Sequence, residues 1–211
     1  MAEDKTLVTA YIVRHGQTRF NVEGITQGHS DSELTEDGIR QAQLLSERFK
    51  GIHFDAVFSS DLLRAQSTAK IITLERELPI NTSELLRERK YGQFEGQHSR
   101  VFREGNKELL ESLKILSRSE RWTLKFADDI ESDEEICNRL VSFLKETTPT
   151  HFGKTVLVVT HGGIMRAFLN YLKWGGSDEL PSGAVQNTAY IKLLSNGTDF
   201  TIEHVDGVKV E

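Results

Sequence analysis

Two histidine-glycine motifs in the 211-residue chain carry the side chains best suited to chemistry. Arg14-His15-Gly16 follows a mostly apolar run at 7–13, and His161-Gly162-Gly163 follows a second such run at 154–160. Histidine can act as a base, a nucleophile or a metal ligand, and the planar guanidinium of arginine suits phosphate oxygens. The first motif alone fits equally well a surface arginine beside a hydrogen-bonded loop histidine, because short motifs produce false matches.

Two further groups of charged residues also fall near the ends of expected strands. Arg64 lies in the first turn of an expected helix, where a cation opposes the helix dipole, so a bound anion would explain its position better than helix stability does. Residues 87–90, Arg-Glu-Arg-Lys, follow an expected strand, and the sequence leaves open whether the two arginines point toward Glu88. The carboxyl ends of parallel strands lie on one edge of a sheet, so these groups can converge there. The commonest ligand for converging cations is phosphate.

These residues fit metal-free phosphoryl transfer through a covalent histidine intermediate. The chain has neither a G-x-x-x-x-G-K-[ST] loop nor an H-E-x-x-H motif, so P-loop nucleotide binding has no support and a dinuclear metal hydrolase is disfavoured. His15 would attack phosphorus while Arg14, Arg64 and His161 hold the phosphoryl oxygens. Glu88 would protonate the leaving alcohol and then accept a proton from the water that cleaves the phosphohistidine.

The elements that position these residues alternate between strand and helix along the chain. Strands are expected at 7–13, 55–58, 80–86, 154–160, 187–194 and 200–205. Helices are expected at 35–50, 62–72, 103–119, 131–147 and 164–173, and 16–33 is expected to be an irregular loop. The alternation predicts an α/β fold, a three-layer α/β/α sandwich in which helices cover both faces of a mainly parallel central sheet. We expect residues 1–211 to form a single domain whose last two strands are antiparallel.

Composition limits the classes of partner. The chain has 26 Lys and Arg against 32 Asp and Glu, a net charge of −6, which argues against general nucleic-acid binding. Its one cysteine, Cys137, excludes an internal disulfide and a cysteine-rich zinc site. No apolar run approaches the ~20 residues that span a bilayer, and residues 1–6 lack the pattern of a signal peptide. We therefore expect a cytoplasmic enzyme or binding protein without a membrane or nucleic-acid partner.

Five motifs, in their order along the chain, resemble those of the histidine phosphatase superfamily, which includes the phosphoglycerate mutases. They are Val13–Thr18, Leu34–Gly38, Ser59–Ala65, Glu88 with Tyr91-Gly92 and Glu95-Gly96, and Thr160–Arg166. The resemblance covers nearly the whole chain. It implies that His15 is the phosphorylated nucleophile, Glu88 the proton donor and His161 a catalytic phosphate ligand, with no metal or cofactor. The other positions that we assign through this resemblance are phosphate contacts at Arg14, Asn21, Arg64 and Gly162 and substrate contacts at Gln27, Gly28 and Tyr91.

The fate of the phosphoryl group separates a phosphatase from a mutase. Cofactor-dependent mutases resemble the chain at 88–92, but they carry a lysine soon after this stretch and an Arg-Arg pair in the insert that follows. Here Ser99 stands at the lysine position, and only single arginines follow, at 100, 103, 118 and 121. These departures favour water as the acceptor. The stretch Leu86–Gly92 is most similar to the TIGAR-like fructose-2,6-bisphosphatase group, which implies a sugar bisphosphate or bisphosphoglycerate substrate, although this chain is shorter before the 154–160 strand.

We therefore expect a metal-independent phosphatase that hydrolyses small phosphorylated metabolites, of the sugar bisphosphate or phosphoglycerate type, through a phosphohistidine. One alternative is a cofactor-dependent phosphoglycerate mutase. The other is a regulatory pseudoenzyme that binds a phosphorylated ligand, although a pure binder does not need the acid Glu88. A homodimer is left open. The remaining histidines are expected on the surface or in loops, at 29, 53, 98, 151 and 204, with His98 near the substrate mouth.

Overall fold

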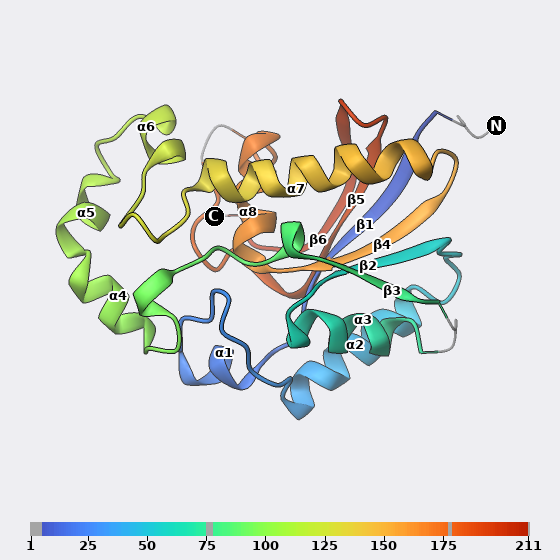
Figure 1. The fold of residues 1–211 in the computed structure, drawn as a ribbon, viewed down its shortest axis with the longest axis horizontal. Helices are drawn as coiled ribbons and strands as arrows, with labels where there is room; N and C mark the ends of the chain where they lie inside the picture. Colours follow the sequence, from blue (N-terminus) through green and yellow to red (C-terminus); the bar gives the residue numbers. More distant parts are fainter. Residues whose placement is uncertain (1–5, 75–77, 177–178, 211) are drawn as a thin grey trace.

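The computed structural model describes residues 6–74, 78–176 and 179–210, and these residues form a sheet with the strand order β3-β2-β4-β1-β5-β6 (Figure 1). The strands are β1 (Val8–Arg14), β2 (Ala56–Ser60), β3 (Ile80–Ser83), β4 (Thr155–Thr160), β5 (Val185–Ser195) and β6 (Phe200–Val208). The first four strands are mutually parallel, and β5 and β6 are antiparallel additions at one side. The mainly parallel sheet is confirmed. Residues 1–5, on which the signal-peptide expectation largely rests, lie outside the described residues.

Helices lie on both faces of the sheet, as Figure 1 shows. The four long helices are α2 (Glu36–Arg48), α3 (Leu63–Ile72), α7 (Asp133–Thr147) and α8 (Gly162–Tyr171). Successive side chains of a strand point to opposite faces, so β1 contributes to both layers of core. Ala10 and Ile12 pack in the apolar cluster that includes α7 and α8, whereas Tyr11 and Val13 pack in the cluster that includes α2 and α3. The predicted three-layer α/β/α sandwich is confirmed.

The expected irregular loop at 16–33 contains a short helix, α1 (Arg19–Glu23). Thr18 and Asn21 form a capping box, in which each side chain accepts a hydrogen bond from the backbone N–H of the other residue. Gly24 ends the helix in the left-handed region, at φ 69°. A helix of five residues is too short to show an apolar periodicity, so the sequence pattern could not reveal it.

Two expected elements are shorter than predicted. The strand expected at 80–86 ends at Ser83 and continues as a 3₁₀ turn, η1 (Glu84–Leu86). The helix expected at 103–119 is divided into short helices, and two further 3₁₀ turns occur in the chain. These elements are α4 (Ser99–Gly105), α5 (Lys107–Ser112), α6 (Arg118–Thr123), η2 (Gly92–Phe94) and η3 (Thr148–Thr150).

The segment α4–α6 extends from the loop after α1 to the end of α8, and Figure 1 shows it beyond one end of the sheet. At its start, the Ser99 N–H donates to the carbonyl of Gly24 over 2.7 Å. At its end, Trp122 stacks on Tyr171 with ring centroids 6.3 Å apart. The segment therefore borders the loop to which the sequence assigns substrate contacts.

Candidate active site

His15 follows β1 and is almost fully buried, with 2% of its surface exposed. Its Nδ1 donates to the carbonyl of Gly16 over 2.7 Å, so in the neutral ring Nε2 carries the free lone pair. Burial, with the nearby Arg64 and Arg14 guanidinium groups, lowers the pKa of His15 well below its usual range. Gly16 must be a glycine because a Cβ there would lie 2.5 Å from the carbonyl oxygen of Gly38. His15 is thus a neutral imidazole with a nucleophilic nitrogen.

His161 follows β4, and its ring centroid lies 5.1 Å from that of His15. Its Nδ1 accepts a hydrogen bond from Arg64 Nε over 3.2 Å, which places the proton of the neutral ring on Nε2. Burial is the main cause that lowers the pKa of His161 well below its usual range, and Arg64 adds to it. The two rings therefore have opposite tautomers, His15 with an acceptor at Nε2 and His161 with a donor there.

Arg14 supplies a second donor beside these rings. Its Nη1 donates to the carbonyl of Val185 over 2.5 Å. Its Nε, like His161 Nε2, is buried without a hydrogen-bond partner in the described part of the chain. Gly162, at the start of α8, gives Arg14 room, because a Cβ on Gly162 would lie 3.0 Å from Arg14 Nε. Two buried donors are thus left for a ligand at one place.

The Arg64 side chain is fully buried and binds the loop at 28–31. Its guanidinium donates to the carbonyls of Gly28 (2.7 Å) and Ser30 (2.8 Å) and to Asp31 Oδ1 (3.1 Å). Asp31 also accepts from the backbone N–H groups of Leu63 and Arg64 at the start of α3. We expected a bound anion to explain a cation at this helix start, but the protein itself supplies the anion, since the Asp31 carboxylate caps the helix. Nη2 of Arg64 retains one further hydrogen for a ligand.

Glu88 is held by backbone groups from two directions. Its Oε1 accepts from the N–H of Arg89 over 2.7 Å, and its Oε2 accepts from the N–H of Gly163 over 2.9 Å. Its own carbonyl accepts from His29 Nε2 (3.0 Å) and Arg139 Nη2 (3.1 Å). A Cβ on Gly163 would overlap Glu88 Oε1, so glycine at that position leaves the carboxyl group its room. The carboxyl group therefore has a fixed place at the start of α8, next to His161.

The arginines that flank Glu88 are bound elsewhere. Arg87 Nε donates to both oxygens of Asp61, at 2.8 and 3.1 Å. Arg89 forms an ion pair with Asp133 and donates to the carbonyl of Glu131 over 2.6 Å. Neither guanidinium forms a hydrogen bond or an ion pair with the Glu88 carboxylate, although Arg89 interacts with it through space.

Three of the remaining predicted residues lie in the loop at 16–33. Asn21 Oδ1 accepts from the N–H of Thr18 over 3.1 Å and from Asn187 Nδ2 over 3.3 Å. Gln27 Oε1 accepts from Thr18 Oγ1 over 3.1 Å. Gly28 takes part through its carbonyl, which binds Arg64. The structure thus connects Asn21 and Gln27 to one threonine and Gly28 to the buried Arg64.

Tyr91 is joined to the same loop through Glu95. Glu95 accepts from the N–H of Tyr91 over 2.8 Å and from the N–H of Ser30 over 3.1 Å. The Tyr91 ring meets Phe102 of α4 edge to face, with centroids 5.6 Å apart. Burial is the main cause that raises the pKa of Tyr91. The Phe102 ring of α4 therefore packs against Tyr91, a predicted substrate residue.

Several residues with contacts to this site were not predicted to be functional. They are His29, Asp31, Arg139, Gly163 and Asn187. Gly163 is the one member that a sequence signal marked, since it belongs to the second histidine-glycine motif. The others act on residues far away in sequence, and no local pattern in the chain reveals such contacts.

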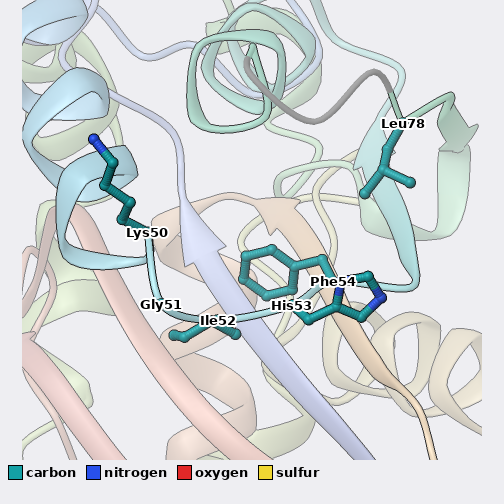
Figure 2. Close-up of a pocket in the computed structure, with 6 residues that line it drawn as sticks. All are labelled: Lys50, Gly51, Ile52, His53, Phe54 and Leu78. Atoms are coloured by element: carbon teal, nitrogen blue, oxygen red, sulfur yellow. The ribbon is translucent and has the colours of Figure 1, made fainter.

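A cavity of about 380 Å³ lies at the opposite edge of the sheet (Figure 2). It is lined by Lys50, Gly51, Ile52, His53, Phe54 and Leu78. These residues precede β2 and β3, so the cavity is at the amino ends of the parallel strands. Ligand sites of open α/β sheets lie at the carboxyl ends, where His15 and His161 are.

Comparison with known proteins identifies the family. The model of the histidine phosphatase superfamily (branch 1) matches residues 10–206. A Hydrogenobacter thermophilus protein, provisionally named phosphoserine phosphatase 2, is 32% identical over 93% of this chain and 94% of its own length. The chain belongs to the histidine phosphatase superfamily. This confirms the expected family and an enzyme of the histidine phosphatase type.

Other members of the superfamily include both phosphatases and mutases. A 2,3-bisphosphoglycerate-dependent phosphoglycerate mutase of Cytophaga hutchinsonii is 33% identical over 77% of this chain and 76% of its own length. The structure of Bacillus stearothermophilus YhfR superimposes with a TM-score of 0.82 at 27% identity, covering 96% of this chain and 98% of that one. In the described ranges, no three His, Cys, Asp or Glu side chains are grouped as ligands for a metal ion. None of the helices in those ranges has the length and apolar character needed to cross a membrane.

Proposed function

We propose that this histidine phosphatase hydrolyses phosphomonoesters of small metabolites through a phosphohistidine at His15, without a metal ion. One observation carries the proposal. Arg14 Nε and His161 Nε2 are buried donors without a partner in the described structure, and they lie beside a neutral His15. Buried polar atoms are almost always hydrogen-bonded, so two orphan donors at one nucleophile mark the place of an anionic ligand. A phosphoryl group supplies the missing acceptors.

The first step transfers the phosphoryl group to the enzyme. His15 Nε2 forms a bond to phosphorus as the bond from phosphorus to the ester oxygen breaks. Negative charge on the equatorial oxygens is stabilised by Arg14, Arg64 and His161, whose positions are fixed before the substrate binds. Burial supports this step because it keeps His15 unprotonated and therefore nucleophilic at neutral pH.

Glu88 is the proposed donor and acceptor of the proton. Its two oxygens each accept one backbone N–H, which leaves room on the carboxyl group for a proton. The protonated acid gives this proton to the leaving alkoxide. Water then attacks phosphorus, Glu88 takes a proton from the water, and the bond from phosphorus to His15 breaks to release inorganic phosphate.

The cations of the α4–α6 segment favour hydrolysis over phosphoryl transfer to a second substrate. A mutase must hold another anionic group near the site. Arg121 binds Glu179 over 2.9 Å and the carbonyl of Leu116 over 2.6 Å, and Arg118 lies 4.0 Å from the same Glu179. Arg100 also forms an ion pair, with Glu104, so three of the four single arginines that follow Ser99 are already paired with a carboxylate.

The same reasoning favours a substrate with one phosphate. The sequence around Glu88 resembles the fructose-2,6-bisphosphatase group, but Arg87 and Arg89 are bound to Asp61 and Asp133. A second phosphate would have to compete with these carboxylates. The relative named as a phosphoserine phosphatase supports a single-phosphate ester as the first substrate to test, with a bisphosphate as the alternative.

The test is a product assay with purified protein and a chelator. Phosphoserine, 3-phosphoglycerate, 2,3-bisphosphoglycerate, fructose 2,6-bisphosphate and an aryl phosphate are offered in parallel, and both inorganic phosphate and phosphoglycerate isomers are followed. We expect phosphate release that the chelator leaves unchanged. Isomer exchange that requires a bisphosphate primer, with little phosphate release, would establish a mutase instead.

Two variants test the assigned roles. His15→Ala should abolish turnover and the acid-labile phosphoenzyme, whereas His53→Ala, at an exposed histidine on the opposite edge of the sheet, should leave both unchanged. Glu88→Gln should slow alkyl phosphates far more than aryl phosphates, because a good leaving group needs little help from an acid. Turnover by His15→Ala at the wild-type rate would exclude the covalent mechanism.

A further inference from the structure

The beginning of β5 carries a bulge that no feature of the sequence predicted. Val185 pairs with Val208 and Tyr190 pairs with Asp206, so the register shifts between them. Thr188 lies in the left-handed region at φ 58°, which is costly for a β-branched residue. Opposite the bulge stands Gly207, where a Cβ would lie 2.9 Å from the Cβ of Ala189. Strained bulges of this kind are over-represented next to active sites, where they aim a side chain.

The bulged segment, residues 185–188, binds three residues of the phosphate site. The carbonyl of Val185 accepts from Arg14 Nη1 over 2.5 Å. Asn187 Nδ2 donates to the carbonyl of His15 over 3.1 Å, and the N–H of Thr188 is 3.4 Å from the same oxygen. Asn187 Nδ2 also donates to Asn21 Oδ1 over 3.3 Å. One amide group thus connects the backbone of the nucleophile to a predicted phosphate ligand.

The contact with Asn21 determines which way its amide group is turned. Oδ1 of Asn21 accepts from two donors, the N–H of Thr18 at 3.1 Å and Asn187 Nδ2 at 3.3 Å. If the oxygen and nitrogen of the Asn21 amide exchanged places, its NH₂ group would face two other donors, and neither hydrogen bond could form. The two donors therefore keep the oxygen on their side and leave the NH₂ group of Asn21 for a ligand. An anion such as phosphate requires a donor at this position.

We infer that Asn187 is a positioning residue for the phosphoryl-transfer site, which holds the backbone of His15 and turns the NH₂ group of Asn21 toward the phosphate. The inference rests on the proposed function. Asn187 does not touch the reacting atoms, so it acts through His15 and Asn21. Its own orientation is fixed by the strained bulge, in which Thr188 Oγ1 donates to the Asn187 carbonyl over 2.7 Å.

The rival explanation is that Asn187 only fills space between β5 and α1. Asn187→Ala removes both the donor and the volume, whereas Asn187→Leu removes the donor and keeps a side chain of similar size and branching. A space-filling role predicts that leucine restores activity. A positioning role predicts that leucine is no better than alanine. Gln186→Ala is the matched control, since the side chain of this neighbouring residue makes an exposed hydrogen bond to the carbonyl of Gly183, which precedes the bulged segment.

The experiment measures kcat/KM and the inhibition constant of inorganic phosphate for each variant, with the melting temperature as a check on folding. We expect both Asn187 variants to lose about 10²-fold in kcat/KM, as a displacement of a catalytic group by about 1 Å does. Inhibition by phosphate should weaken by about tenfold, the range for losing one hydrogen bond to a charged ligand. Should Asn187→Ala fold poorly, Asn187→Leu alone decides the question.

Asn21→Ala, alone and combined with the Asn187 substitution, completes a double-mutant cycle. In that background, the Asn187 substitution should change the phosphate inhibition constant by no more than about twofold, because residues that act as a unit are not additive. Equal effects in both backgrounds would overturn the inference, and so would rescue by leucine. Failure of the proposed function is distinguishable from failure of this inference. If the proposed function is wrong, the wild-type protein itself neither releases phosphate nor is inhibited by it.

Discussion

Gly163→Ala is the sharpest test of Glu88 as the proton donor. The N–H of Gly163 binds Glu88 Oε2 over 2.9 Å, and a Cβ added at Gly163 would overlap Oε1 and lie 3.0 Å from Cδ. Ordinary contacts of such a Cβ begin at 3.4 Å. Because Oε1 is also held by the N–H of Arg89, the carboxyl group cannot move away without weakening that second bond. The substitution therefore displaces the acid and leaves its chemical identity unchanged.

The magnitude follows from the size of the displacement. To clear the new methyl group, the carboxyl group must retreat by roughly 1 Å, and a misplacement of that size costs about 10²-fold in rate. General acid catalysis contributes about 10²–10⁴-fold, so the whole loss can be drawn from this step. We expect kcat to fall by about 10²-fold for alkyl phosphates and by less than about tenfold for aryl phosphates that leave without a proton. Alanine is a better helix former than glycine, so the start of α8 should not be destabilised.

The assay compares kcat over a series of phosphate esters whose leaving groups span a wide range of pKa. Gly51→Ala is the matched control, because a Cβ there has no atom within 4 Å and its backbone is not in the left-handed region. A second arm places Gly163→Ala in the Glu88→Gln background, where the extra methyl group should cost little more. An equal loss for alkyl and aryl esters, or wild-type rates throughout, would refute the assignment of Glu88.

Three other predictions concern stability, two of them from buried charged or titratable groups and one from backbone strain. Since burial lowers the pKa of His15 and His161, the unfolded chain binds more protons than the folded one below about pH 6.5. As the pH falls below that value, the free energy of unfolding should decrease by up to about 1.4 kcal/mol per pH unit for each histidine. A free energy of unfolding that stays constant from pH 7 to pH 5.5 in urea titrations would contradict this. Asp31→Ala removes the carboxylate from the buried Arg64 and the cap from α3, which should lower the free energy of unfolding by about 2 kcal/mol or more; an unchanged melting temperature would argue against it. Thr188→Gly relieves a backbone strain of about 1–3 kcal/mol and costs about 1 kcal/mol in conformational entropy of the unfolded chain. Chemical denaturation should therefore show an equal or higher free energy of unfolding. A loss above about 1 kcal/mol would count against strain at this position.

Much of the fold was predictable because its strongest signals are local. Buried parallel strands are continuous apolar runs, and β1 and β4 stand out in the sequence for that reason. The segment α4–α6 was predicted less well. Gly105 and Asn106 interrupt the single helix that the pattern predicts at 103–119, and the segment contacts Gly24 and Tyr171 at its two ends.

The site was predictable to the extent that strand ends converge. His15, His161 and Glu88 each follow a strand or its extension, so a parallel sheet brings them to one edge. The partners that orient them were not predictable in this way. Asp31 caps a helix that begins 32 residues later, and Asn187 reaches His15 across 172 residues of sequence. Such contacts depend on the bulge of β5 and on the path of the loop at 16–33, which no periodic pattern encodes.

The two histidines show how the same side chain is given opposite roles by its neighbours. At His15 a backbone carbonyl accepts from Nδ1, so Nε2 must be the acceptor, and an acceptor can attack phosphorus. At His161 a guanidinium donates to Nδ1, so Nε2 must be the donor, and a donor can hold an oxygen. Exchanging these two partners would leave both histidines in place and reverse the donor and acceptor roles of Nε2. The chemistry of the site therefore depends on Arg64 and the turn at Gly16 as much as on the imidazole rings.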